Sequence, residues 1–182
     1  MYDHVSYFSN MSPFYLKQGL LLRDFFFSIG GEELINTVKK LNDTGEHISG
    51  DIEYDFNSLF TGPGKLLAPP YASVYLDEDM LLMGNSTLSV RNFMLNYGIR
   101  VSDNINIPDD HISCEIEFII LLLRKSQEDK QYLSVLRQFC NEHFLLWIPP
   151  FIERIMKNAR TNEIKNTALI LKCWVEKLTT GI

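Results

Sequence analysis

Apolar side chains recur every three or four positions along most of this 182-residue chain. That spacing places them on one face of an α-helix. The clearest stripe consists of Val90, Phe93, Met94 and Tyr97. Ser86 precedes it as the expected N-cap, and Gly98 follows it where a left-handed residue often ends a helix. The pattern therefore predicts a helix between these two residues.

The same periodicity predicts helices along most of the remaining chain. They are expected over residues 13–29, 32–41, 51–60, 111–125, 132–143, 150–159 and 162–178. Pro149 and Pro150 are expected to break the chain and to start the helix that follows them. Only the stretch from Ala72 to Leu76 alternates as a strand does, so the chain is predicted to be all-α.

The segment from Ile99 to Pro108 has no helical pattern and is rich in Asn, Asp and Ser. We interpret it as a hinge loop that joins two helical halves, about 1–98 and 109–182. The length of the chain fits one compact domain made of these halves. The helix after the hinge is apolar nearly all round, which predicts that it is central and enclosed.

Composition and charge exclude several classes of protein. The chain is 46% hydrophobic and 22% charged, as soluble globular proteins are, and its net charge is −6. Such a charge argues against a nucleic-acid partner, because displacing the counterions of phosphate needs a basic face. Cys114, Cys140 and Cys173 are widely spaced and include no Cys-x-x-Cys pair, so neither a zinc site nor a disulfide framework is indicated.

The sequence also predicts a cytoplasmic location. Its first ten residues, MYDHVSYFSN, have neither the basic nor the apolar region of a secretory signal. The densest apolar run, Ile116 to Leu123, is only about eight residues long, whereas roughly twenty are needed to span a bilayer.

Asp109, Asp110 and His111 stand directly ahead of the apolar helix, and three interpretations of this cluster are open. One aspartate suffices to cap a helix, which we expect of Asp109, and this leaves Asp110 and His111 for another role. The cluster could instead hold the metal of a small all-helical hydrolase, although the other histidines lack ligand spacing. In the third interpretation, a partner docks there.

No motif in the sequence indicates nucleophilic catalysis or phosphate binding. A Gly-x-Ser-x-Gly elbow is missing, and GPGK at 62–65 lacks the spacing of a phosphate loop. No catalytic residue is therefore predicted.

Two motifs together resemble a known family. The first is APPYASVYLDEDMLLMGNSTLSVRNFMLNYGI, and the second is PDDHI, at 108–112. They are similar to motifs of the TorD/DmsD/NarJ group of redox-enzyme maturation chaperones, and most of all to the DmsD branch. The family pattern has Pro-Pro-Trp-Gly-Ser-Val-aromatic-Leu-Asp, then Phe-Gly-Asp-Ser-Thr-Leu, then Glu-Pro-x-Asp-His. This chain departs from it with Tyr71 for the tryptophan and Ile107 for the glutamate.

The resemblance implies an all-helical cytoplasmic chaperone, with no enzymatic activity and no cofactor of its own. Its partner would be the twin-arginine signal peptide of a molybdenum-cofactor oxidoreductase precursor, such as a DMSO reductase-like subunit, held until export by the Tat system. Tat translocase components are further candidate partners. Family members are monomers that can form domain-swapped dimers through the hinge, and some are proposed to bind GTP.

The resemblance also implies a peptide-binding site. We expect Asp110, with Asp109 as a second candidate, to bind an arginine, since a guanidinium fork pairs with a carboxylate through two hydrogen bonds. His111 would orient the carboxylate or bond the peptide backbone. The full set of expected peptide-binding residues is Tyr71, Ser73, Tyr75, Leu76, Pro108, Asp110, His111 and Trp147.

Overall fold

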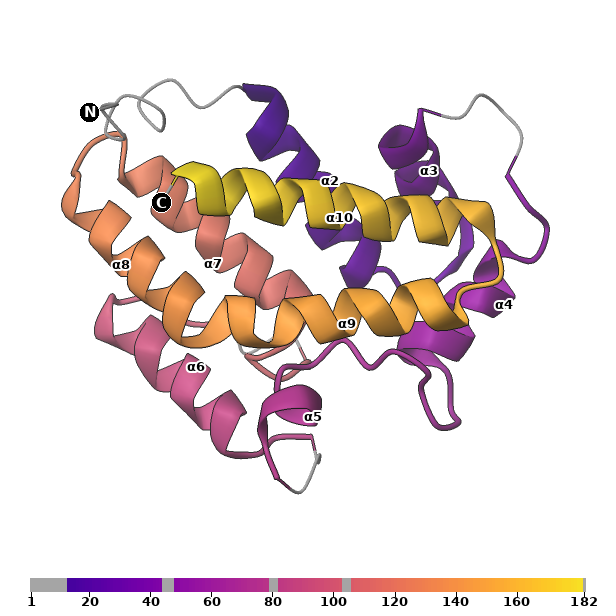
Figure 1. Ribbon diagram of the computed structural model, residues 1–182, viewed down its shortest axis with the longest axis horizontal. Coiled ribbons are helices and arrows are strands. Elements are labelled where there is room, and N and C mark those ends of the chain that lie inside the picture. The colour runs from indigo at the N-terminus through magenta and orange to yellow at the C-terminus, as the bar shows by residue number, and fades with distance from the viewer. Residues whose placement is uncertain (1–12, 44–47, 79–81, 103–105, 182) are drawn as a thin grey trace.

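The computed structural model describes residues 13–43, 48–78, 82–102 and 106–181, and these residues are mainly helical (Figure 1). The elements are α2 (Pro13–Phe27), α3 (Gly31–Asn42), α4 (Ile52–Phe56), the π-helical turn η1 (Asn57–Thr61), α5 (Ser73–Leu76), α6 (Asn85–Asn96), α7 (Ile112–Lys125), α8 (Gln131–Phe139), the π-helical turn η2 (Cys140–Phe144), α9 (Leu145–Asn158) and α10 (Asn162–Gly181). The all-α prediction is confirmed. None of the described helices is long and apolar enough to cross a membrane.

Helix α7 lies at the centre of the molecule, as its all-round apolar sequence predicts. It packs against α2 and α8, and its buried residues are Ile112, Ser113, Glu115, Ile116, Phe118, Ile119, Ile120, Leu122 and Leu123. Helices α9 and α10 run side by side, and α10 also contacts α2, α3 and α4 (Figure 1). Helices from the beginning and the end of the chain therefore share one core.

The core contains a cluster of phenylalanine rings. Phe25 of α2 lies edge-on to Phe26, with centroids 4.9 Å apart, and edge-on to Phe56 of α4 at 5.3 Å. Phe60 contacts Phe26 at 5.4 Å, and Phe151 of α9 contacts the same ring at 5.5 Å. Edge-to-face pairs contribute beyond the apolar area that they bury. These rings hold α2, α4, η1 and α9 together.

The alternating stretch at 72–76 forms the one-turn helix α5, in agreement with the all-α prediction. The prediction for the two prolines is wrong. Pro149 and Pro150 do not break the chain, because they lie inside α9, which follows α8 and η2 without interruption. Both prolines are on the exposed face of α9, whereas Trp147 and Phe151 are buried on the other face. Burial of these aromatic side chains offsets the two backbone donors that proline lacks.

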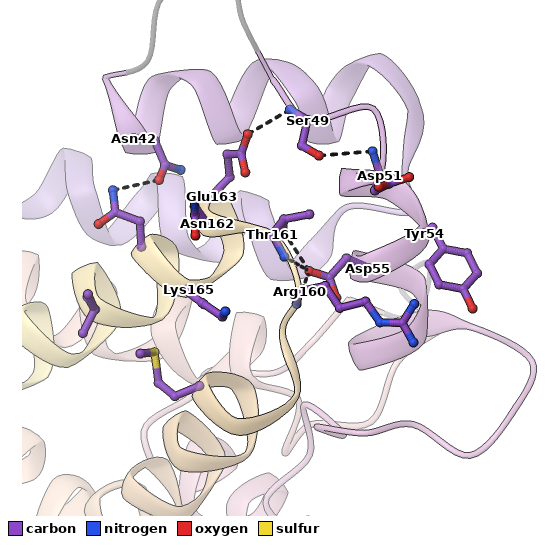
Figure 2. A pocket seen from close by; sticks show the side chains of 13 residues that line it. Asn42, Ser49, Asp51, Tyr54, Asp55, Arg160, Thr161, Asn162, Glu163 and Lys165 are labelled. Carbon is purple, nitrogen blue, oxygen red and sulfur yellow. Dashed lines mark hydrogen bonds between the residues drawn. The ribbon is translucent and has the colours of Figure 1, made fainter.

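A buried carboxylate joins α4 to the link between α9 and α10 (Figure 2). Asp55 Oδ2 accepts hydrogen bonds from the backbone N–H groups of Arg160 at 2.9 Å and Thr161 at 2.7 Å, and from the Thr161 hydroxyl at 2.8 Å. A carboxylate at the start of α10 also faces the positive end of that helix dipole. Asp55 lines a pocket of about 1040 Å³, at whose edge the Arg160 guanidinium lies 5.4 Å from the centroid of the Tyr54 ring.

Candidate functional site

The two motifs of the sequence meet through a short antiparallel bridge between Tyr71 and His111. Ala72 donates its backbone N–H to the Asp110 carbonyl at 3.0 Å, and Ile112 donates to the Pro70 carbonyl at 3.0 Å. The segment that leads into α5 is thereby fixed against the start of α7. The bridge brings four of the expected site residues together: Tyr71, Ser73, Asp110 and His111.

Asp110 is fully buried at this junction. Its Oδ2 accepts a hydrogen bond from the Ser73 backbone N–H at 2.8 Å. Its Oδ1 and the Ser73 hydroxyl are also buried, and neither has a hydrogen-bond partner among the described residues. Buried polar atoms are nearly always paired in folded proteins, so these two unpaired atoms indicate unused hydrogen-bonding capacity. Because Asp110 is fully buried, a ligand reaches it only if a neighbouring segment moves.

His111, not Asp109, is the N-cap of α7, so the predicted capping role of Asp109 is wrong. His111 has extended backbone dihedrals, and its Nδ1 accepts a hydrogen bond from the Ser113 N–H at 3.2 Å. Burial lowers the pKa of His111 to about 3, so the ring is neutral near pH 7. The ring packs edge-on to Tyr71, with centroids 5.0 Å apart.

Asp109 forms an ion pair instead. Its Oδ2 accepts hydrogen bonds from Arg91 of α6, at 2.8 Å from Nε and 2.7 Å from Nη2. Asp109 is buried, whereas the Arg91 side chain is 45% exposed. This pair connects α6 to the segment before α7, and it occupies the carboxylate that the sequence suggested as a second arginine acceptor.

Tyr75 of α5 packs on Trp147 of α9, with ring centroids 5.7 Å apart. Trp147 is fully buried, and its indole N–H donates to Glu115 Oε2 at 3.0 Å. The Arg154 guanidinium covers the Tyr75 ring at 4.7 Å. Trp147 is therefore part of the core below the site. The expected residues that keep partial exposure are Tyr71, Tyr75, Leu76 and Pro108.

Glu115 and His143 form a buried pair that was not predicted from the sequence. Glu115 Oε1 lies 2.7 Å from His143 Nε2, and Glu115 is fully buried. Burial raises the pKa of Glu115. Burial alone would lower the pKa of His143, but pairing with Glu115 outweighs it and raises that pKa. An acid within the apolar run of α7 was the available signal, but its partner lies 28 positions away.

Apolar side chains are exposed beside the junction, on α6 and just before it. They are Leu82, Met83, Leu88 and Leu95, and each is about half exposed. A pocket of about 400 Å³ lies between α6 and residues 100–102 and 107–109, and Leu95 and Ile107 line it with the Arg91–Asp109 pair. Ile107 thus places an apolar side chain where the family pattern has a carboxylate.

The interpretation of the cluster as the metal site of a hydrolase lacks a set of metal ligands in the part of the chain that the structure describes. No group of three or more His, Cys, Asp or Glu side chains there could hold a metal ion. Asp109 is paired with Arg91, and His111 Nδ1 is turned to Ser113.

Comparisons with known proteins define the class to which the chain belongs. The family described as nitrate reductase delta subunit matches residues 30–153, so the chain is a member of that family. It is 31% identical over 137 residues to "Probable Tat proofreading chaperone DmsD" of Haemophilus influenzae, covering 75% of this chain and 64% of that protein. It is 33% identical over 128 residues to "Chaperone protein TorD" of Aliivibrio salmonicida, covering 66% and 60%. The resemblance to the TorD/DmsD/NarJ group is confirmed.

The fold agrees with this assignment. A crystal structure described as that of a redox enzyme maturation protein from Archaeoglobus fulgidus superposes with a TM-score of 0.56 at 20% identity, covering 90% of this chain and 93% of that one. At this identity the likeness shows the fold alone. The matches to the two curated relatives span less than two thirds of those proteins' length. The relatives are named as chaperones, and none of these comparisons supports a hydrolase.

Proposed function

We propose that this protein is a chaperone, not an enzyme, that binds the twin-arginine signal peptide of a molybdenum-cofactor oxidoreductase precursor. It acts in the cytoplasm and holds the precursor until the cofactor is loaded and export by the Tat system can begin. The names of the DmsD and TorD relatives support this proposal. Transfer to Tat translocase components, and a domain-swapped dimer formed through the hinge at 99–108, belong to the same proposal.

The observation that carries the proposal is the unpaired Asp110 Oδ1 at the junction of the two family motifs. A carboxylate oxygen accepts hydrogen bonds, and a guanidinium supplies five donors in a fixed planar arrangement. A peptide arginine that reached Asp110 would satisfy Oδ1 and compete with the Ser73 N–H for Oδ2. Binding of the peptide therefore displaces α5 from the start of α7, and it exposes the Tyr71 and Tyr75 rings to the part of the peptide that carries the arginines.

Titration calorimetry with a twin-arginine peptide tests the proposal. We expect micromolar or tighter binding to the wild-type protein, and at least tenfold weaker binding of the same peptide with both arginines replaced by lysine, since lysine lacks the planar fork. Asp110→Asn should weaken binding of the arginine peptide at least tenfold, whereas Asp51→Asn, at an exposed position, should not change it.

The outcomes separate the parts of this proposal. Failure of the wild-type protein to bind any twin-arginine peptide would refute the chaperone function. Binding that is equally tight in wild type and Asp110→Asn would remove Asp110 from the site and leave the function standing. Circular dichroism of each variant is the control: a helical signal equal to that of the wild type shows that a loss of affinity does not come from unfolding.

A further inference from the structure

A second hollow lies on the other side of the α7 start, between α2, the beginning of α3, the end of α6 and α7. It has a volume of about 540 Å³, within the range of ligand pockets. Apolar side chains form its floor and walls: Phe27, Met94, Ile99, Val101, Phe118 and Leu121. Ser113 and Cys114 also line it, so it adjoins the candidate site through the first turn of α7.

Phe27 gives this pocket an open apolar wall. Its side chain stands at the end of α2 and is 47% exposed, while Met94 and Phe118 behind it are buried. A large aromatic ring that is half exposed at the mouth of an apolar pocket loses water when an apolar ligand covers it. The pocket therefore suits an apolar segment.

The rim of the pocket carries an excess of negative charge. Three carboxylates (Asp24, Glu33 and Glu117) and two guanidinium groups (Arg23 and Arg100) line it. Glu33, in the first turn of α3, forms no ion pair with a described residue, and it is exposed. An exposed carboxylate of this kind is available to a basic ligand.

Arg23 shows that this rim can hold a guanidinium group. Its Nη1 contacts Glu117 Oε2 of α7, and its Nε and Nη2 bond Asp24 Oδ1 at 2.9 Å and 2.6 Å. The three side chains are between 31% and 42% exposed, so the ion pairs can exchange with those of a ligand. An incoming arginine would find the same acceptors, together with Glu33.

We infer that this α2–α7 pocket binds an apolar peptide segment that has basic residues at its edge. Under the proposed function, on which the inference rests, the occupant is the apolar segment next to the twin arginines. The apolar side chains enter between Phe27 and Leu121, and the carboxylates of Glu33 and Glu117 face the basic residues. The signal peptide then contacts both sides of the first turn of α7, with Asp110 on one side and this pocket on the other.

Two matched pairs of variants test the position of the peptide by calorimetry. Phe27→Ala should weaken binding of a twin-arginine signal peptide roughly tenfold, because it removes a large apolar contact. Phe14→Ala, at an exposed position on the same helix, should leave the affinity within twofold. Glu33→Gln should weaken binding about threefold and reduce its dependence on salt, since an exposed charge pair is screened. Glu153 is an exposed acid of α9, and Glu153→Gln should change neither the affinity nor its dependence on salt.

A cross-linking measurement locates the peptide independently of affinity. A signal peptide with a photoreactive phenylalanine in its apolar segment should cross-link to residues 94–102 or 114–121. If the wild-type protein binds the peptide but Phe27→Ala and Glu33→Gln bind it unchanged, or if cross-links fall on 71–76 alone, the pocket assignment is overturned and the proposed function stands. If the wild-type protein binds no twin-arginine peptide, both are overturned.

Discussion

Asp109, Asp110 and His111 are neighbours in the sequence, yet each has a different role in the structure. Asp109 pairs with Arg91, Asp110 binds the Ser73 N–H, and His111 caps α7. The sequence singled out the cluster because two aspartates and a histidine before an apolar helix are conspicuous. It could not assign the roles, because the partners lie up to 37 positions away and because the cap depends on which residue is the last with extended dihedrals.

The buried His111 makes the stability of the protein sensitive to acid. Its pKa is about 3 in the folded state, against 6.5 in the unfolded chain. Between these values the unfolded chain binds a proton that the folded state does not, so stability falls as the pH decreases from 6.5 toward 3. Each pH unit costs about 1.4 kcal/mol, which amounts to about 2 kcal/mol between pH 7.5 and pH 5.

The variant His111→Asn isolates this effect, because asparagine can still accept the Ser113 N–H as an N-cap but does not titrate. Urea unfolding at pH 7.5 and pH 5 should show that the variant loses about 2 kcal/mol less than the wild type over this interval. The other ionisable groups titrate in both proteins alike. If the two proteins lose equal stability between pH 7.5 and pH 5, the burial of a neutral His111 is not the cause of acid sensitivity.

At the scale of elements, the start of α6 depends on a side chain that lies outside the helix. The expected cap, Ser86, is inside the first turn, and the N-cap Gly84 has no side chain with which to cap. Asp77, just after α5, accepts the Ser86 N–H at 3.1 Å and is also bonded by the Ser86 hydroxyl. This contact gives a physical reason for Leu-Asp and Gly-Asn-Ser-Thr to occur together in one motif.

Gly84 leaves the space that this carboxylate needs. A Cβ at Gly84 would lie 2.0 Å from Asp77 Oδ2. Gly84→Ala should therefore displace Asp77, and each of Gly84→Ala and Asp77→Ala should lower the free energy of unfolding by about 1 kcal/mol, the usual effect of losing a cap. The double variant should lose clearly less than the sum, because the two substitutions remove the same contact.

Urea unfolding of the wild type, the two single variants and the double variant measures the coupling energy between Gly84 and Asp77. Gly64→Ala is the matched control, since a Cβ there meets no atom within 4 Å and the change should stay within about 0.5 kcal/mol. Additive losses in the double variant would mean that Gly84 and Asp77 act separately.

The helix boundaries show where sequence periodicity suffices and where it does not. Gly98 has a φ of 70° and follows α6, as the sequence predicts, because only local backbone geometry is involved. The course of the chain through Pro149 and Pro150 was not predictable in this way. It depends on the burial of Trp147 and Phe151 against elements that precede them by many residues.

At the scale of the whole molecule, the two ends of the described chain stabilise each other. Tyr15 of α2 stacks on Trp174 of α10 with centroids 5.3 Å apart, and its hydroxyl donates to the Trp174 carbonyl at 3.0 Å. A Cβ on Gly19 would lie 3.0 Å from the same indole ring. The sequence predicted both helices, but it contained no local signal that they meet across 159 positions.

This contact leads to a prediction about the part of the chain that the family match leaves out. The match covers residues 30–153, so all of α2 and all of α10 lie outside it. Six apolar side chains of α10 are nonetheless buried in the shared core: Ile164, Ala168, Leu171, Trp174, Val175 and Leu178. Each large one stabilises the fold by about 1.5–3 kcal/mol, so together they contribute on the order of 10 kcal/mol, comparable to the whole stability of a domain.

A chain that ends after Arg160 should therefore lose its cooperative fold, although it keeps every residue of the family match. Circular dichroism should show a loss of helix greater than the 20 residues of α10 account for, and urea should give no cooperative transition. A chain that ends after Leu178 retains all six buried apolar side chains and should unfold as the full chain does. Cooperative unfolding of the shorter chain would show that residues 13–160 form a complete core by themselves. The helix that the family match omits would then be an addition to the fold instead of a part of it.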